Sequence, residues 1–222
     1  MIYGMTASRP DLLARFEGTV LLLRALEEKD LPALFTAIGR PEIFAGGWGG
    51  GMGAYRDDFE QWSEFLRQWL PWQQCNVYAV CLRSEDDRVI GTTTLGDFDL
   101  ENESVHIGWT AYSPHFWGSG VNADAKRLLL NAAFTHGFER VRLQADVLNI
   151  RSRAAIERIG AQPEGVLRHV QRRADGSWRD TAIYSILREE WPHVRTRLEQ
   201  RLAAQPKDLN QSRQGRREHS SR

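Results

Sequence analysis

The chain of 222 residues is long enough for one large domain or two small ones. Hydrophobic residues make up 41% and charged residues 26%, the balance of an ordinary globular protein that can bury a core. The formal net charge is zero, but residues 205–222 carry +3 and the remainder −3, and a slightly acidic body argues against a broad nucleic-acid surface.

The cysteine count and the hydropathy pattern exclude several other classes of protein. Cys75 and Cys81 have no His or Cys cluster beside them, so neither a disulfide framework nor a metal site is expected. No apolar run approaches the roughly 18 residues that a membrane span needs. Charged residues interrupt positions 1–18, so this segment does not have the pattern of a signal peptide. We therefore expect a cytoplasmic protein with no membrane partner.

The first part of the chain alternates apolar runs with amphipathic segments. Residues 19–24 form a predicted strand, and residues 28–38 follow with apolar side chains at helical spacing. Six glycines within 46–53 disfavour helix and strand, because glycine loses the most backbone entropy on ordering, and they predict a mobile loop. A second amphipathic helix is expected over 57–70, before Pro71.

The second part is predicted to be rich in strands. Strands are expected at 77–82, 89–97, 105–112 and 141–147, and a hairpin at 166–173 and 178–187 around Asp175-Gly176. Helices are expected at 121–136, 150–159 and 188–203. The polar residues at the end of the chain, 204–222, have little apolar surface to bury and are predicted to be disordered.

The predicted strand 105–112 should present two different faces, because successive side chains of a strand alternate. One face would carry the apolar residues Val105, Ile107, Trp109 and Ala111. The other face would carry His106, Gly108, Thr110 and Tyr112.

Two glycines, Gly118 and Gly120, stand immediately before the predicted helix 121–136. Unpaired amides and the helix dipole favour an anion at a helix N-terminus, and glycine lets a phosphate approach closely. Lys126 and Arg127 would add positive charge, whereas the alternative is a tight turn without a ligand. The segment lacks both the third glycine of a dinucleotide-binding fingerprint and the Gly-Lys-Ser/Thr of a P-loop. The sequence therefore excludes the commoner classes of nucleotide-binding enzyme.

Three segments of the chain resemble, in the same order, motifs of the GNAT superfamily of N-acetyltransferases. They are FWGSGVNADAKRLLL, DVLNIRSRAAIERIGAQPEGVLR and ADGSWRDTAIYSI. The resemblance covers residues 16–190 and is strongest to the RimJ/RimL-like branch, which acetylates N-termini of ribosomal proteins. It implies an α/β (α+β) fold whose mixed, mostly antiparallel sheet of about seven strands is splayed at the acetyl-CoA site and flanked by helices. It divides the chain into an N-terminal extension 1–18, a GNAT domain 19–203 and a disordered polar tail 204–222.

The resemblance implies that the cofactor is acetyl-CoA. The turn Trp117–Val121 would hold the pyrophosphate through backbone amides, although Trp117 replaces the Arg or Gln usual in the family. The pantetheine arm would lie between strands 105–112 and 141–147 and pair with their backbone as an added strand does. The cofactor-binding residues expected on this basis are Trp109, Thr110, Trp117, Gly118, Ser119, Gly120, Val121, Asn122, Asn149 and Ser152.

Two of these residues match the family's Asn-x-x-Ser pattern. The match implies that Asn149 binds the pantetheine arm and that Ser152 protonates the departing thiolate. Taken without the resemblance, Asn149 would be a helix N-cap and Ser152 a first-turn residue.

The identity of the general base stays open between several residues. His106 stands where many relatives carry Glu, and a neutral imidazole accepts a proton at cellular pH. Glu103 is the second candidate for catalysis, although it could equally be a solvent-exposed residue at the start of a strand. Asp97 and Asp99, which follow a predicted strand at the expected acceptor cleft, are further candidates for the base. Trp48, Asp97 and Tyr184 are expected to border the acceptor cleft.

The predicted function is an acetyl-CoA-dependent N-acetyltransferase in which an amine attacks the thioester directly in a ternary complex. An α-amine, with a pKa of about 7.8, needs only a weak base, whereas a lysine side chain, with a pKa of about 10.4, needs a strong one. The acceptor would be a protein N-terminus or a small-molecule amine. The alternative is a catalytically silent acyl-CoA-binding or sensor protein, favoured by His106 and the glycine loop. This branch also suggests a homodimer.

Overall fold

The computed structural model describes residues 6–204 and is built around one eight-stranded sheet in the order β1-β2-β3-β4-β5-β6-β8-β7. The strands are β1 (Phe16–Glu17), β2 (Leu21–Ala25), β3 (Asn76–Leu82), β4 (Arg88–Asp99), β5 (Ser104–Tyr112), β6 (Arg140–Asp146), β7 (Gln162–Arg172) and β8 (Trp178–Leu187). All neighbouring strands are antiparallel except β5 and β6, which run parallel. The expected mixed sheet is confirmed, and the two-residue strand β1 adds to the seven strands expected.

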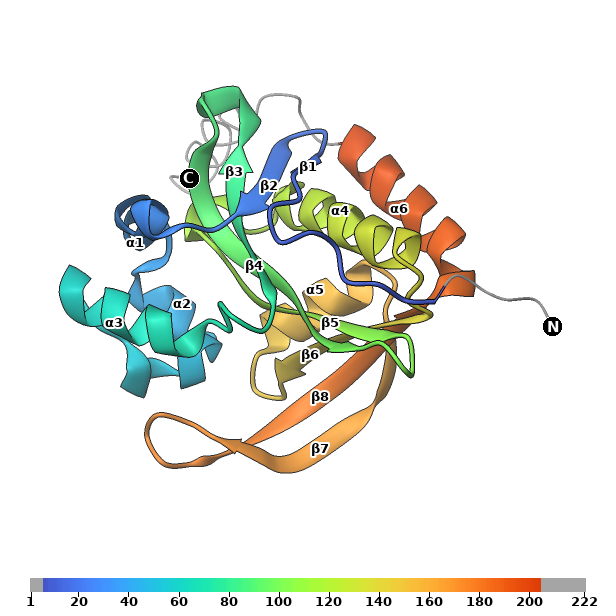
Figure 1. The fold of residues 1–222 in the computed structure, drawn as a ribbon. Helices are drawn as coiled ribbons and strands as arrows, with labels where there is room; N and C mark the ends of the chain where they lie inside the picture. Colours follow the sequence, from blue (N-terminus) through green and yellow to red (C-terminus); the bar gives the residue numbers. More distant parts are fainter. Residues whose placement is uncertain (1–5, 205–222) are drawn as a thin grey trace, which may run out of the picture.

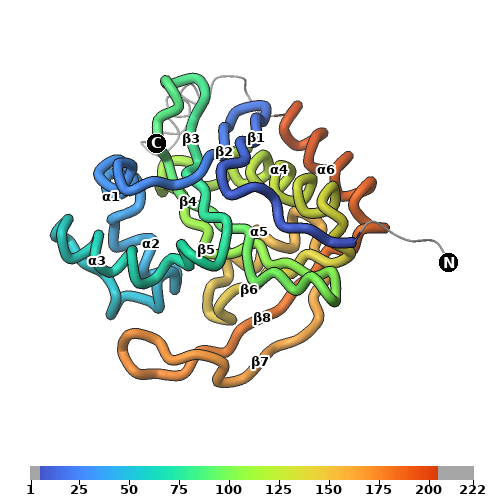
Figure 2. Tube along the Cα trace, viewed as in Figure 1, coloured from blue at the N-terminus to red at the C-terminus, as the bar shows by residue number. Residues whose placement is uncertain are grey.

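Helices cover both faces of this sheet (Figures 1 and 2). They are α1 (Leu31–Ile38), α2 (Pro41–Ala45), α3 (Phe59–Trp69), α4 (Val121–Thr135), α5 (Ile150–Arg158) and α6 (Trp191–Ala203). Side chains of β3 alternate between two apolar cores, with Tyr78 beside α4–α6 and Ala79 beside α1–α3. The sheet is therefore the middle layer of three, with a separate core on each face.

The chain between β2 and α3 differs from its prediction. A 3-10 turn at Glu28–Asp30 precedes α1, and the short helix α2 was not expected. The glycine segment 46–53, predicted as a loop, contains the 3-10 turn Trp48–Gly50 and the start of a second one, Met52–Ala54. Its Gly50 carbonyl accepts a hydrogen bond of 3.0 Å from the amide of Ala174. The segment therefore contacts the β7–β8 hairpin.

The predicted two-face pattern of residues 105–112 is wrong beyond Gly108. One residue of β4 lies between Thr92 and Thr94, opposite two residues of β5, so β5 contains a bulge. Trp109 within this bulge has a φ of 47°. Ile107 consequently packs beside α4–α6, whereas Trp109 packs on the other face, beside α1–α3. A bulge reverses the alternation of side chains, and apolar periodicity alone does not reveal it.

The pairing of β5 with β6 ends after three residue pairs, the last of which joins His106 to Arg142. Beyond this pair the strand segments 107–112 and 143–146 no longer pair with each other, although each strand keeps its partner on the other side. The splayed sheet expected from the resemblance is confirmed, and it leaves unpaired backbone on both sides of the gap.

The described part of the predicted N-terminal extension packs against the domain. Phe16 and Glu17 pair with β2, and the amide of Ser8 donates a hydrogen bond of 2.8 Å to the carbonyl of His136. Residues 6–18 therefore lie on the same body as the domain. The tail predicted to be disordered lies almost entirely outside the described residues.

Within residues 6–204, no helix combines the length and the apolar character required to cross a bilayer. No group of three or more metal-ligating side chains comes together in the same range. Cys75 and Cys81 are buried free thiols.

The carboxylate of Asp124, in the first turn of α4, ties this helix to the sheet. It is fully buried and accepts hydrogen bonds from the amides of Val20, at 2.8 Å, and Leu21, at 3.1 Å. Arg127 of the same helix pairs with it at 2.9 Å. A Cβ at Gly18 would lie 2.3 Å from this carboxylate, so glycine is required there. These contacts fix the N-terminal end of α4 relative to β2.

We expect Asp124→Ala to lower the free energy of unfolding by about 3 kcal/mol, because the change leaves two buried amides and one arginine without their acceptor. Urea unfolding followed by far-UV circular dichroism measures the change. Glu199→Ala, which removes an exposed helix ion pair with Arg195, is the control and should change stability by less than about 0.5 kcal/mol. A loss at Asp124 as small as this control would contradict a structural role for the carboxylate.

Candidate active site

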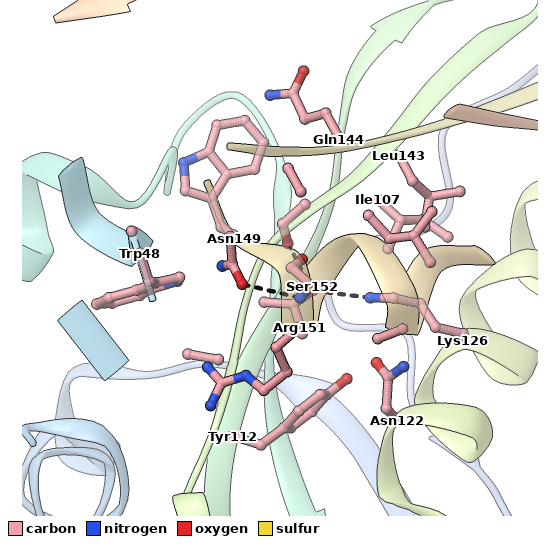
Figure 3. A pocket seen from close by; sticks show the side chains of 18 of the residues that line it. Trp48, Ile107, Tyr112, Asn122, Lys126, Leu143, Gln144, Asn149, Arg151 and Ser152 are labelled. Carbon is pink, nitrogen blue, oxygen red and sulfur yellow. Dashed lines mark hydrogen bonds between the residues drawn. The ribbon is translucent and has the colours of Figure 1, made fainter. Parts of the chain in front are cut away.

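A cavity of about 480 Å³ lies where β5 and β6 separate (Figure 3). Its wall includes Leu143 and Ile156 from the core beside α4–α6, and Ile43 and Trp48 from the core beside α1–α3. The cavity therefore reaches both faces of the sheet. In the close-up, Asn122 of α4 and Trp48 lie on opposite sides of it.

One end of the cavity is formed by the turn that precedes α4. Gly118 has a φ of 78°, and a Cβ at this position would have nothing within 4 Å. Gly120, at the N-cap, has an ordinary φ of −69°, so only the first glycine needs the left-handed conformation. The amides of both glycines donate to no other described residue, whereas the Ser119 hydroxyl donates to the carbonyl of Phe116 at 2.6 Å. The turn is thus held by its own hydrogen bonds and leaves amides for an anion.

Eight of the ten expected cofactor-binding residues line the cavity: Trp109, Thr110, Trp117, Gly118, Ser119, Asn122, Asn149 and Ser152. Gly120 and Val121 do not line it. The side chain of Val121 is fully buried in the core beside α4–α6, and only the backbone of this residue belongs to the turn.

Trp117 stands where the family that this sequence resembles usually has Arg or Gln. Arg151 supplies a positive charge beside Trp117. The Arg151 guanidinium lies 3.2 Å from the centroid of the Trp117 ring, close enough for a cation–π contact. The indole nitrogen of Trp117 donates to the carbonyl of Tyr112 at 3.1 Å, which fixes the ring plane. Arg151 also lines the cavity, so its positive charge faces the space beside the turn.

The two basic residues expected to support the turn occupy different surroundings. Arg127 points to Asp124 and does not line the cavity. Lys126 is 5% exposed and lines it, and its Nζ donates to the Thr110 hydroxyl at 2.9 Å (Figure 3). Burial lowers the pKa of Lys126 to about 7, because an ammonium group without water is unfavourable. Lys126 is therefore part of the cavity wall and titrates near neutrality.

Asn149 caps α5, as its residue type alone suggested. Its side-chain oxygen accepts from the amide of Ser152 at 2.9 Å, and its side-chain nitrogen donates to the carbonyl of Gly46. The cap links α5 to the segment that carries Trp48. The hydroxyl of Ser152 has no hydrogen bond to any residue that the structure describes, and Ser152 lines the cavity. The serine hydroxyl is therefore available to a ligand.

His106 lines the cavity and is held from behind by Asp97. Its Nδ1 lies 3.0 Å from the Asp97 carboxylate, which also binds Arg142 at 2.7 Å. A carboxylate partner makes Nδ1 the donor, so Nε2 keeps its lone pair, and Nε2 is buried without a hydrogen-bond partner among the described residues. Burial outweighs the attraction of Asp97 and lowers the pKa of His106 below its usual 6.5. The ring packs over Gly108, where a Cβ would lie 2.4 Å from it.

Besides Gly120, Val121 and the further candidate Asp99, three predicted site residues do not line the cavity. Tyr184 is 1% exposed, and its hydroxyl accepts from Arg153 and donates to Glu157, so it is a core residue and the expectation that it borders the acceptor is corrected. Glu103 lies at the β4–β5 turn, where its carbonyl accepts from the amide of Glu139. Asp97 reaches the cavity only through His106.

Several residues of the cavity wall were not recognised as site residues in the sequence, although Asp146 and Arg179 lie within two of the segments that resemble the GNAT superfamily. They come from separated segments of the chain: Trp69, Tyr112, Asp146, Gln171, Arg179 and Arg201. Lys126 had one usable signal, since it is a charged residue among the apolar positions of a helix whose buried side includes Leu129 and Leu130.

The chain is similar in sequence and in fold to known acetyltransferases. YdaF of Bacillus subtilis (strain 168), named as a candidate ribosomal N-acetyltransferase, is 36% identical over 108 residues, which is 48% of this chain and 57% of that protein. This chain thus spans little more than half the length of that curated relative. An acetyltransferase structure from T. thermophilus matches with a TM-score of 0.76 at 34% identity, covering 88% of this chain and 98% of that chain.

RimJ of Mycobacterium smegmatis, in complex with CoA-disulfide, shares the fold at a TM-score of 0.66 and 23% identity, covering 83% of this chain and 91% of that chain. The name given to YdaF agrees with the expected RimJ/RimL-like branch, and the likeness to RimJ concerns the fold. The family model of the acetyltransferase (GNAT) domain matches residues 20–162, well over half of the chain. The chain therefore belongs to the GNAT acetyltransferase family.

Proposed function

We propose that this protein is an acetyl-CoA-dependent N-acetyltransferase in which an amine attacks the bound thioester directly. The observation that carries the proposal is the cavity at the separation of β5 and β6, which reaches both faces of the sheet. A cofactor can enter beside α4 and an acceptor beside α1–α3, so the two substrates meet within the sheet. RimJ, a structural neighbour, holds a CoA derivative, which agrees with this use of the fold.

The residues beside α4 would bind the cofactor. The free amides of Gly118 and Gly120 at the helix N-terminus suit a pyrophosphate, and Arg151 adds positive charge beside them. The unpaired backbone of β5 and β6 suits the amide groups of a pantetheine arm, which can pair with it as an added strand does. Bound acetyl-CoA supplies the acetyl thioester.

The proton balance of the reaction assigns roles to His106 and Ser152. The amine nitrogen forms a bond to the acetyl carbon while the carbon–sulfur bond breaks, and the amine proton passes to the lone pair of His106 Nε2, directly or through one water. The Ser152 hydroxyl donates a proton to the departing thiolate and regains one from solvent. Neither step forms a covalent enzyme intermediate, so neither cysteine is needed.

The His106–Asp97 pair favours an enzyme over a silent acyl-CoA-binding protein. A silent binder needs no oriented base, whereas here a carboxylate fixes the tautomer of a cavity-lining imidazole. Release of the CoA thiol with a panel of amines tests the two functions. Tight binding of acetyl-CoA without amine-dependent thiol release would favour the silent protein.

Gly118→Val should weaken acetyl-CoA binding about 10-fold or more, because a side chain at φ 78° strains the turn and fills the space for the phosphates. Isothermal titration with acetyl-CoA measures the affinity. Gly176→Val is the matched control, since Gly176 has a φ of 83° with no neighbour within 4 Å but lies outside the cavity wall. Equal affinities of the two variants for acetyl-CoA would show that the turn is not part of the binding site.

Ser152→Ala should lower kcat about 10-fold or more and leave the affinity for acetyl-CoA nearly unchanged, because only proton delivery to the thiolate is lost. Stopped-flow thiol release and titration with acetyl-CoA separate the two effects. Turnover equal to that of the wild type would exclude Ser152 from the mechanism.

A base with a lowered pKa predicts the shape of the pH profile. His106 must be neutral to accept a proton, so kcat/KM should fall as the pH decreases, with a midpoint below 6.5. His106→Gln should remove this decrease, the acidic limb of the profile, and lower kcat/KM about 100-fold. Asp97→Asn should move the limb to lower pH, because the carboxylate favours the imidazolium. A limb near pH 7 that survives in His106→Gln and disappears in Lys126→Met would assign the titration to Lys126 instead.

A further inference from the structure

The end of the cavity beside α1–α3 contains one carboxylate, that of Asp146, and it is already neutralised. Arg173 binds it with two nitrogen atoms, at 2.9 Å and 3.0 Å, and the amide of Leu148 donates to it at 2.9 Å. Asp146 is 5% exposed. Its oxygens therefore have little capacity left to attract a cationic ligand.

Arg179 lies beside this pair and has no comparable partner among the described residues. Its Nε is 4.0 Å from Asp146 and is buried without a hydrogen bond, and its one hydrogen bond is a long one of 3.5 Å from Nη1 to Gln171. The side chain is 12% exposed and lines the cavity. A buried guanidinium with unused donors is unfavourable unless a ligand satisfies them.

The pKa of Arg179 is consistent with an unsatisfied charge. It is lowered from its ordinary value because the loss of water outweighs the attraction of Asp146, and Arg173 adds repulsion. The three side chains Asp146, Arg173 and Arg179 leave one positive charge in excess. An anionic oxygen group bound here would restore the balance.

The other groups at this end also lack hydrogen-bond acceptors. Trp48 and Trp69 line the cavity, and the indole nitrogen of each has no partner among the described residues. The whole described wall contains a single carboxylate, that of Asp146, and five basic side chains, those of Lys126, Arg151, Arg158, Arg179 and Arg201. A polyamine, with several positive charges, would be repelled by such a wall.

We propose that the acceptor amine also carries a carboxylate and that Arg179 binds this carboxylate. This inference rests on the proposed function and names its substrate class. The apolar part of the acceptor lies against the rings of Trp48 and Trp69, which supply a large contact area. The acetyl group passes from the thioester sulfur to the amine nitrogen as described above, and the carboxylate takes no part in bond formation.

The experiment compares each acid with its amide, which lacks the negative charge of the carboxylate. The panel contains free α-amino acids, ω-amino acids and dipeptides, each beside its C-terminal amide, with spermidine as a cationic reference. CoA thiol release gives kcat/KM for each acceptor. We expect at least one acid to exceed its amide on the order of 100-fold, because the amide leaves the guanidinium without its charged partner.

Arg179→Gln should abolish this preference by lowering kcat/KM for the acid while the amide and the affinity for acetyl-CoA stay unchanged. Arg172→Gln is the matched control, because Arg172 lies on the same hairpin but points to the carbonyl of Gly176 and does not line the cavity. If the Gln variant does not fold, Arg179→Lys, which keeps the charge and loses the planar donor pair, should reduce the preference partially.

Three outcomes would overturn the inference. The amides or spermidine could prove the better acceptors, Arg179→Gln could affect acids and amides equally, or the variant could lose affinity for acetyl-CoA, which would assign Arg179 to the cofactor. Failure of the proposed function is a separate result, namely no thiol release with any amine. In that event, titration of N-acetylated acids and their amides into protein saturated with CoA still decides whether Arg179 selects a carboxylate.

Discussion

The pairing of β5 with β6 stops at His106 and Arg142, and the candidate site depends on this break. If the strands stayed paired to their ends, their backbone groups would satisfy each other and no cavity could reach both faces of the sheet. The break also leaves backbone donors and acceptors beside the N-terminus of α4, where further amides are free. The end of the β5–β6 pairing thus creates the cavity, exposes polar backbone groups to it and connects the two faces of the sheet.

A second constraint is the bulge of β5 at Trp109. By reversing the alternation of side chains, the bulge places Thr110 where Lys126 of α4 can bind it, and it places Trp109 on the opposite face beside the ring of His106. His106 of β5 and Lys126 of α4, which binds Thr110 of β5, therefore line the same cavity beside this strand. Ionisable groups of the region are held in short networks, such as that of Asp97 with His106 and Arg142.

Much of the candidate site could be predicted because its residues are close in sequence and follow a family pattern. Gly118, Asn122, Asn149 and Ser152 lie in two short motifs at helix starts, where local geometry alone aims backbone amides and first-turn side chains at a common point. Tyr184 failed as a prediction because nothing in a strand sequence tells which face packs on a helix. Arg179 was missed because its role requires Asp146 and Arg173, which come from other segments.

The sequence by itself determined most of the helices and strands, although not β1 or α2, and it determined the family and the glycine turn before α4, since periodicity, glycine positions and motifs are local properties. Only the tertiary structure decided that Asp97 binds His106, that Lys126 is buried beside Thr110 and that the Arg179 Nε is buried without a hydrogen-bond acceptor among the described residues. The physical reason is that burial and hydrogen bonding arise between segments far apart in the chain. Desolvation and long-range partners, rather than residue type, decide which ionisable groups remain available to a ligand.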